Sequence, residues 1–307
     1  MSQKMVVTGG AGFIGSNLAR RLAEENEVLV IDDMSVGKKE NLAGIDVQIL
    51  VGSIDDLEML KNAFQGVDCI FHLAAIASVQ KSIEDPLKTN EINLGGTLNV
   101  LVAARDAGAR RMIFASSAAV YGDSLELPKR EEMVPQPKSP YAITKLAGEH
   151  YCRVFNEVYG LETASLRFFN VFGPWQDPNS EYSGVISKFI SAAYSGRNPM
   201  VFGDGTQTRD FVFVEDVVRA CILICRSKVS GTYNIARGQS TSLNQLLQMI
   251  GNVAGNEIQP IYAESRPGDI KHSLADVFRA RSIGFNPETS MKDGLKRTME
   301  WIAQQNI

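Results

Sequence analysis

A glycine cluster near the start of the chain constrains the fold more than any other feature. Residues 5–8 form a short apolar run, Gly9, Gly10, Gly12 and Gly15 follow, and apolar residues then recur with helical spacing. Glycine allows a tight turn and lets a bound group approach the backbone closely. The free N–H groups and the dipole at the start of a helix favour negative charge. Strand, turn and helix in this order predict a pyrophosphate site.

A second apolar run, over residues 27–31, ends at Asp32 and Asp33. An acidic residue at this distance after the glycines, at the end of the second strand, is where the ribose hydroxyls of NAD are held in dinucleotide-binding folds. A glycine-rich turn by itself is weak evidence, because such turns also occur without a ligand. The turn and the acid together predict a site for NAD.

Composition narrows the classes of protein that the chain can belong to. Its 307 residues, 44% of them hydrophobic, are enough for one large domain or two smaller ones. The net charge of −4 offers no basic surface for nucleic acid or an anionic membrane. We see neither a signal peptide nor an apolar run long enough to span a bilayer, so we expect a cytoplasmic protein.

The cysteine pattern predicts no metal site. Cys221 and Cys225 lie four residues apart on an expected helix, which is a spacing that two metal ligands can have. We interpret them as small buried residues, since no second pair of cysteines or histidines has ligand spacing.

Strands and helices alternate through the first half of the chain. Alternation of this kind predicts an α/β fold, a doubly wound (Rossmann) parallel sheet with helices on both faces and ligands at the carboxyl ends of the strands. After the first two strands we expect further strands over 46–51, 69–75, 112–117 and 163–168, and helices over 57–64, 86–108 and 141–159.

The pattern changes after Asn170, where loops become longer and richer in proline, glycine and asparagine. We expect residues 1–170 to form the dinucleotide-binding domain. Residues 206–238 are expected to return to it, with a strand and then a helix over 211–224. The predicted smaller α/β lobe, which would hold the substrate, takes residues 171–205 and 239–307.

Three residues after the expected strands can perform acid–base chemistry. Ser117 ends a strand, and Tyr141 and Lys145 share one face of a helix because they lie four residues apart. A lysine ammonium favours the phenolate and lowers the pKa of tyrosine from about 10. A shift to near 7 takes roughly 3 units, or about 4 kcal/mol. Such a tyrosine is a general base for an alcohol. A Tyr-x-x-x-Lys pair also occurs by chance on exposed helices, but the dinucleotide turn favours the catalytic interpretation.

The chain resembles the extended short-chain dehydrogenase/reductase family, and within it the UDP-sugar 4-epimerases. The resemblance covers essentially the whole chain. It implies that Ser117, Tyr141 and Lys145 are catalytic, that NAD is the cofactor and a UDP-sugar the substrate, and that the protein is a homodimer. It rests on Thr8-Gly9-x-x-Gly12-x-x-Gly15, Asp32, His72-Leu73-Ala74-Ala75, Asn93, Ser117, Tyr141-x-x-x-Lys145 and Arg209-Asp210-Phe211.

The same resemblance implies two sets of binding residues. The NAD site would be formed by Gly9, Gly12, Phe13, Ile14, Gly15, Asp32, Asp33, Ser35, Ser53, Ile54, Leu73, Ala74, Ala75, Asn93, Tyr141, Lys145 and Phe168. The sugar nucleotide would contact Ser78, Gln80, Ser117, Asn170, Val185, Arg209, Arg266, Asp269 and Ser273. Two arginines suit the diphosphate because they are planar, charged donors.

The residues after Ser117 favour epimerisation over related reactions. The related dehydratases and decarboxylases carry acidic residues directly after this position, whereas this chain has Ala118 and Ala119. In the expected reaction Tyr141 takes the C4 hydroxyl proton and NAD the C4 hydride, and the 4-keto sugar receives the hydride back on its other face. The alternatives are a UDP-glucuronate epimerase or decarboxylase, a dehydratase, or a non-catalytic NAD-binding sensor. Sensors in the family usually lack the tyrosine or the lysine.

The choice of sugar is predicted from a position that gates the pocket in similar epimerases. Ser273 occupies it here, and a small side chain leaves room for a 2-acetamido group that tyrosine would exclude. Residues 175–178 and 78–82 also resemble segments of the N-acetylhexosamine epimerases. We therefore expect UDP-GlcNAc and UDP-GalNAc as substrates, with UDP-Glc and UDP-Gal as further ones.

Overall fold

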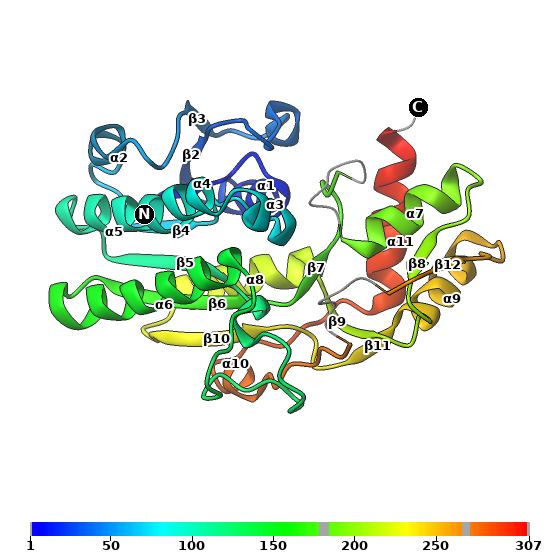
Figure 1. Ribbon diagram of the computed structural model, residues 1–307. Helices are drawn as coiled ribbons and strands as arrows, with labels where there is room; N and C mark the ends of the chain where they lie inside the picture. Colours follow the sequence, from blue (N-terminus) through cyan, green and yellow to red (C-terminus); the bar gives the residue numbers. More distant parts are fainter. Residues whose placement is uncertain (1, 178–183, 266–270, 306–307) are drawn as a thin grey trace. The chain divides into compact units, whose positions relative to one another are not determined.

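The computed structural model describes residues 2–177, 184–265 and 271–305 (Figure 1). The chain divides into two compact units, each made of three segments. Unit 1 comprises residues 1–122, 134–168 and 218–233, and unit 2 comprises residues 123–133, 169–217 and 234–307.

Unit 1 is built on a seven-stranded sheet with the order β10-β6-β5-β4-β1-β2-β3. Each neighbouring pair from β6 to β3 is parallel. The chain builds outward from β1 in both directions, so the strand order reverses beside β1, where ligands bind in sheets of this type. The predicted doubly wound fold is confirmed. The strands are β1 Lys4–Thr8, β2 Glu27–Asp32, β3 Gln48–Val51, β4 Cys69–His72, β5 Arg111–Ser117, β6 Glu162–Phe168 and β10 Gly231–Ile235.

Helices cover both faces of this sheet. On one face Ile70 of β4 packs in a buried cluster with Leu60, Leu101 and Phe155 from three helices. Its neighbour Cys69 points to the other face, because side chains alternate along a strand, and there it meets a further helix, α8. The helices of this unit are α1 Phe13–Leu22, α2 Leu57–Ala63, α3 Val79–Glu84, α4 Pro86–Asn90, α5 Gly96–Asp106, α6 Pro140–Tyr159 and part of α8 Val214–Arg226, with short 3₁₀ segments η1 Lys39–Leu42 and η3 Ala118–Tyr121.

The helix expected over 86–108 is interrupted. A π-helical segment, η2 Glu91–Gly95, separates α4 from α5. A side chain at Gly96 would lie 2.5 Å from Ile54, so α5 begins close to the turn that follows β3. The strand expected over 69–75 is also shorter, because it ends at His72 and Leu73–Ala75 turn away against the glycine loop.

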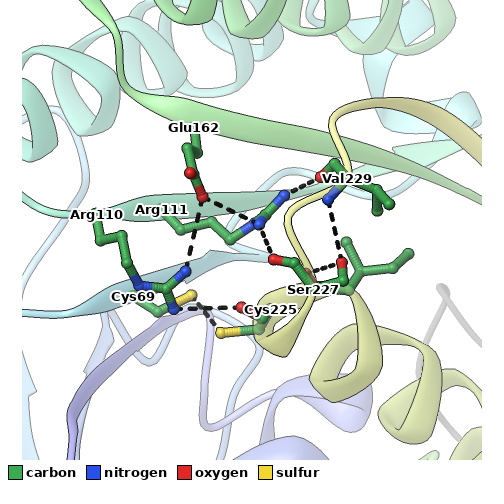
Figure 2. A network of polar contacts seen from close by, with 8 residues as sticks. Cys69, Arg110, Arg111, Glu162, Cys225, Ser227 and Val229 are labelled. Carbon is green, nitrogen blue, oxygen red and sulfur yellow. Dashed lines mark hydrogen bonds and ion pairs between the residues drawn. The ribbon is translucent and has the colours of Figure 1, made fainter.

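A buried arginine fastens the amino-terminal edge of the sheet. Arg111, the first residue of β5, is fully buried and donates hydrogen bonds to the carbonyls of Ser227 and Val229 (Figure 2). Its guanidinium also lies 3.1 Å from Glu162, the first residue of β6. The connection from α8 to β10 is thereby tied to the edge opposite the expected ligand site.

Unit 2 contains two small sheets, one with the order β11-β9-β7 and one that pairs β12 with β8. Phe172, Phe213 and Leu295 belong to its core. The strand predicted to return to the large sheet, β9, instead pairs in parallel with β7, so only α8 and β10 return. The elements are β7 Asn170–Phe172, α7 Val185–Tyr194, β8 Met200–Phe202, β9 Thr208–Phe213, β11 Ser240–Ser242, α9 Leu243–Ala254, β12 Ile261–Ala263, α10 Phe278–Ser282 and α11 Met291–Gln305.

No helix in the described parts of the chain has the length and apolar character needed to cross a membrane. All four cysteines are buried and free, as the small-residue interpretation of Cys221 and Cys225 predicts. Among residues 2–177, 184–265 and 271–305, no group of three or more histidine, cysteine or carboxylate side chains could hold a metal ion.

Candidate active site

The glycine turn has the geometry that a bound pyrophosphate requires. Gly9 adopts a φ of +70°, and a side chain there would lie 2.7 Å from the Ala74 nitrogen. A side chain at Gly15 would lie 2.1 Å from the Gly9 carbonyl oxygen, so the first turn of α1 can pack this tightly only with glycine. Gly12 caps α1 without a side-chain hydrogen bond, which leaves the N-terminal amides of the helix to an anionic ligand.

Asp32 stands at the end of β2, beside this turn. Its carboxylate accepts hydrogen bonds from the backbone N–H groups of Ala11 and Met34, each at 2.9 Å. Burial raises its pKa, while these two hydrogen bonds oppose the shift. Asp33 is exposed and accepts hydrogen bonds from the Ser35 backbone and hydroxyl. Both acids therefore lie at the end of β2, the place where a ribose is held in dinucleotide-binding folds, and their contact with NAD stays a prediction.

The loop after β4 is held by Asn93. The Asn93 side chain accepts a hydrogen bond from the Ile76 amide at 2.7 Å and donates to the Ile76 carbonyl at 3.0 Å. It also donates to the Thr144 hydroxyl of α6 at 3.3 Å. Asn93 was predicted to contact NAD, and its contacts in the structure are those of a support for the loop that continues from Leu73–Ala75.

His72 is a neutral core histidine. Its ring nitrogens lie 2.8 Å from the Thr8 hydroxyl and 2.9 Å from the Thr97 hydroxyl. Burial lowers its pKa from 6.5 to about 3, and the nearby positive charge of Lys145 adds to the shift. The histidine in the family motif therefore links β1 to α5 without taking a proton near neutral pH.

Ser117 and Tyr141, two of the predicted catalytic residues, lie next to each other. Ser117 ends β5, caps η3 by accepting a hydrogen bond from the Ala119 amide at 3.1 Å, and also hydrogen-bonds the Tyr141 phenol. Tyr141 stands in the first turn of α6, where the Ser139 hydroxyl caps the helix and Pro140 occupies its first position. Burial raises the pKa of Tyr141, and the hydrogen bond with Ser117 opposes that shift.

Lys145 lies one turn further along α6 and is buried. Its Nζ donates a hydrogen bond to the Ala115 carbonyl at 2.9 Å and lies 5.8 Å from the centre of the Tyr141 ring. Burial lowers the pKa of Lys145 to about 8. The expected lowering of the tyrosine pKa by this lysine is not seen in the ligand-free site, where burial of the phenol raises that pKa and the hydrogen bond with Ser117 opposes the shift. Lys145 is nevertheless held by the end of β5, within reach of a ligand beside Tyr141.

The other predicted NAD residues in unit 1 lie on the same edge of the sheet. Ser53 and Ile54 follow β3, and Phe168 ends β6. Phe13 and Ile14 begin α1 and are partly exposed. Because parallel strands end at one edge, these residues share it with Ser117 and Asp32.

Unit 2 brings two of the predicted substrate residues together. Arg209 lies on β9, one residue after Thr208. The Ser273 amide donates a hydrogen bond to the Thr208 carbonyl at 3.1 Å. Asn170, on the neighbouring strand β7, is exposed, and Val185 begins α7. Arg266 and Asp269 lie outside the described residues.

Ser78 and Gln80 make local contacts in unit 1. The Ser78 hydroxyl caps α3 by accepting a hydrogen bond from the Lys81 amide at 3.1 Å. Gln80 is exposed and donates to Glu84 at 2.9 Å, one turn further on. Their assignment to the sugar site stays a prediction.

Sequence reasoning missed a buried ion pair between α6 and β6, one helical turn after Lys145. Glu149 of α6 and Arg167 of β6 are joined by two hydrogen bonds of 2.9 and 2.8 Å, and Ser116 lies 2.5 Å from the same carboxylate. Two signals were available. An arginine interrupts the apolar β6, and Glu149 continues the four-residue spacing of Tyr141 and Lys145.

Comparison with known proteins agrees with this geometry. The sequence pattern of the NAD dependent epimerase/dehydratase family matches residues 5–236. A putative UDP-glucose 4-epimerase of Methanocaldococcus jannaschii is 38% identical over 98% of this chain and 99% of its own length. Further relatives, 30% and 31% identical, are called UDP-glucuronate 4-epimerase and UDP-glucuronic acid decarboxylase 1.

Two solved structures are similar over the whole chain. The UDP-N-acetylglucosamine 4-epimerase from Methanobrevibacter ruminantium, in complex with UDP-N-acetylmuramic acid, is 41% identical with a TM-score of 0.96 over 99% of both chains. The UDP-glucose 4-epimerase from Thermotoga maritima, with UDP-glucose, is 37% identical with a TM-score of 0.96 over 99% of this chain and 100% of its own. With its glycine turn, its Ser117–Tyr141–Lys145 set and these full-length matches, the chain belongs to the NAD dependent epimerase/dehydratase family, the extended short-chain dehydrogenases/reductases, and its cofactor is NAD.

Proposed function

We propose that the protein is an NAD-dependent 4-epimerase that interconverts UDP-GlcNAc and UDP-GalNAc, and also accepts UDP-Glc and UDP-Gal. The observation that carries the reaction type is the turn that Ser117 caps. It contains Ala118 and Ala119 and no acid, so the site pairs a tyrosine base with no carboxyl group at the position from which a dehydratase or decarboxylase would act.

Three residues of unit 1 have separate roles in the proposed reaction. NAD, when bound, supplies the acceptor and later the donor of the C4 hydride. Tyr141 takes the proton of the C4 hydroxyl and returns it. Ser117, which hydrogen-bonds the phenol in the ligand-free site, donates its hydrogen bond to the C4 oxygen when the substrate is bound. Lys145, fixed to the Ala115 carbonyl, supplies positive charge that favours the phenolate.

Residues of unit 2 support the choice of substrate. Arg209 is a planar, charged donor suited to a diphosphate. His272 forms a β-bridge with Thr208, and Ser273 is the next residue along the chain. The small side chain of Ser273 leaves space for an acetamido group. The relative that is named for UDP-N-acetylglucosamine, at 41% identity, favours the same sugar.

An NMR assay with two substrates tests this proposal. Purified protein is incubated with UDP-GlcNAc and, separately, with UDP-Glc, without added cofactor, and the anomeric protons are followed. We expect the galacto epimer in both tubes, with the faster rate for the acetamido sugar. No turnover in either tube, with or without added NAD, would contradict the proposal, and UDP-glucuronate would then be the next substrate to test.

We also propose that the protein forms a homodimer through α4 and α6. Apolar side chains are exposed on both helices, with Leu87 84% exposed and Val158 66% exposed. Sedimentation or light scattering of the wild type should give twice the mass of the chain, and Leu87→Asp combined with Val158→Asp should give a monomer. A wild type that is monomeric would refute the dimer without affecting the proposed reaction.

A further inference from the structure

A buried carboxylate lies two turns after Tyr141 on the same helix. Glu149 and Arg167 have side chains only 6% and 4% exposed, and they meet in a two-pronged ion pair. Burial lowers the pKa of Arg167, but the hydrogen bonds and charge of Glu149 outweigh it and hold that pKa above its ordinary value. The Arg167 guanidinium therefore stays charged, in surroundings where charge is costly.

The contacts of this pair lie near the predicted catalytic residues on β5 and α6. Ser116, which contacts the Glu149 carboxylate at 2.5 Å, precedes Ser117 on β5. Arg167 is the strand partner of Ser116. One turn before Glu149, Lys145 is bound to the Ala115 carbonyl. The helix that carries the base is thus fixed to the strand that carries its serine by two polar contacts in successive turns.

A buried ion pair of this kind contributes little to stability compared with apolar residues, and its established use is to select one arrangement. Placement of a base matters strongly, since a displacement near 1 Å costs up to about 100-fold in rate. On the proposed epimerase function, we infer that Glu149 and Arg167 are positioning residues: they hold α6 in the register that brings Tyr141 to Ser117, and Glu149 neutralises the charge of Arg167 behind the reactive phenol.

The inference has an electrostatic consequence. Eight residues of α-helix separate Glu149 from Tyr141, which is about 12 Å. A unit charge left unbalanced at that distance, at an effective dielectric constant near 20, shifts a pKa by about one unit. The polar and ionisable groups around the pair are Ser116, Tyr121, Lys145 and Cys152. Glu149 supplies the carboxylate that balances Arg167, and the other charged group named here, Lys145, is also a cation, so Glu149→Gln leaves additional net positive charge near the pair.

Two substitutions separate position from charge. Glu149→Asp keeps the charge but shortens the side chain, so the carboxylate cannot reach both Ser116 and Arg167. We expect kcat to fall about 10- to 100-fold with KM unchanged, and the pKa of Tyr141 to stay as in the wild type. Glu149→Gln keeps the length and removes the charge. We expect it to lower the pKa of Tyr141 by about one unit, and a second change, Arg167→Gln, to restore that pKa.

The pKa of Tyr141 is measured from tyrosinate absorbance, as the difference between each protein and its Tyr141→Phe counterpart. This readout needs no turnover. An inactive wild type would therefore count against the proposed function alone, while the titration would still test the pair. Near-UV circular dichroism and the thermal midpoint show whether each variant is folded.

The network in Figure 2 provides a matched control. Glu162 begins β6, five residues before Arg167, and pairs with the buried Arg111. We expect Glu162→Gln to lower the thermal midpoint while the Tyr141 pKa and kcat stay unchanged. A Glu149→Gln protein with wild-type Tyr141 pKa, or a Glu149→Asp protein with wild-type kcat, would overturn the inference and leave the pair with a structural role like that of Glu162.

Discussion

Lys145 lies one helical turn after Tyr141, yet its ammonium is bound to the Ala115 carbonyl, with Nζ 5.8 Å from the centre of the tyrosine ring. The lysine is therefore aimed at the end of β5, in the space beside the phenol. Burial lowers its pKa to about 8 and raises that of Tyr141. A bound ligand that adds positive charge or hydrogen bonds beside the phenolate would therefore lower the pKa of Tyr141 and make it a better base.

Lys145→Met should lower kcat by about 100- to 10,000-fold, the range attributed to general acid–base catalysis. The loss of the ammonium removes the charge that favours the phenolate, so activity should also require a higher pH. The pH dependence of kcat checks both effects. Arg153→Met, on the exposed side of the same helix, is the control and should leave the rate and its pH dependence unchanged.

Gly9→Ala should greatly reduce the NAD content of the purified protein. An alanine there would adopt a strained positive φ, and its Cβ would lie 2.7 Å from the Ala74 nitrogen. Gly66 has the same φ of +70° with open space around it, so Gly66→Ala should cost only the strain, about 1–2 kcal/mol. Equal cofactor content in the two variants would contradict the close approach of the turn to Leu73 and Ala74.

His72 should make folding sensitive to acid. Its pKa is about 3 in the folded protein and 6.5 without burial, so the unfolded chain binds a proton first as the pH falls. The contribution of neutral His72 to the free energy of unfolding is complete above pH 6.5 and is lost between pH 6.5 and 3. The full loss corresponds to about 5 kcal/mol.

Thermal midpoints of the wild type and of His72→Asn, taken from neutral pH downward, test this linkage. The wild type should be more stable at pH 7, and the difference should narrow as the pH falls. A difference that stays constant with pH would mean that His72 does not remain neutral in the fold.

Ser273→Tyr should shift specificity toward plain hexoses. The larger ring would fill the space that an acetamido group needs, so turnover of UDP-GlcNAc should fall at least about 10-fold while that of UDP-Glc is retained. Ser273→Ala keeps the space open and serves as the control. The ratio of kcat/KM for the two sugars is the measurement, and an equal loss for both would argue that Ser273 does not gate the sugar.

Several features of the fold could be predicted because they depend on short stretches of sequence. The turn from β1 to α1 needs glycine at Gly9 because φ is +70° there, and at Gly15 because the backbone of Gly9 and Gly10 leaves no room for a side chain. The spacing of Tyr141 and Lys145 on α6 follows from helix geometry alone. These local requirements were enough to indicate the parallel sheet, the cofactor and the reactive residues.

Strand partners were less predictable. Residues 211–213 have the apolar character of a buried strand, which suits either sheet, and their pairing with β7 depends on contacts between distant segments. The interruption at η2 was likewise not predicted, and the close approach of Gly96 to Ile54 that follows it joins segments far apart in the sequence.

The sequence by itself determined the cofactor turn and the order of helix and strand in unit 1, because those follow from steric limits and periodicity within a few residues. Only the tertiary structure decided which charges became buried. No local pattern names the partners of Glu149, Arg167 and Arg111, yet each lies in the interior with a partner from another strand or helix. A buried charge is tolerated only where a partner meets it. Partners 18 residues apart meet where α6 packs on β6, and partners 51 residues apart meet where β5 pairs with β6.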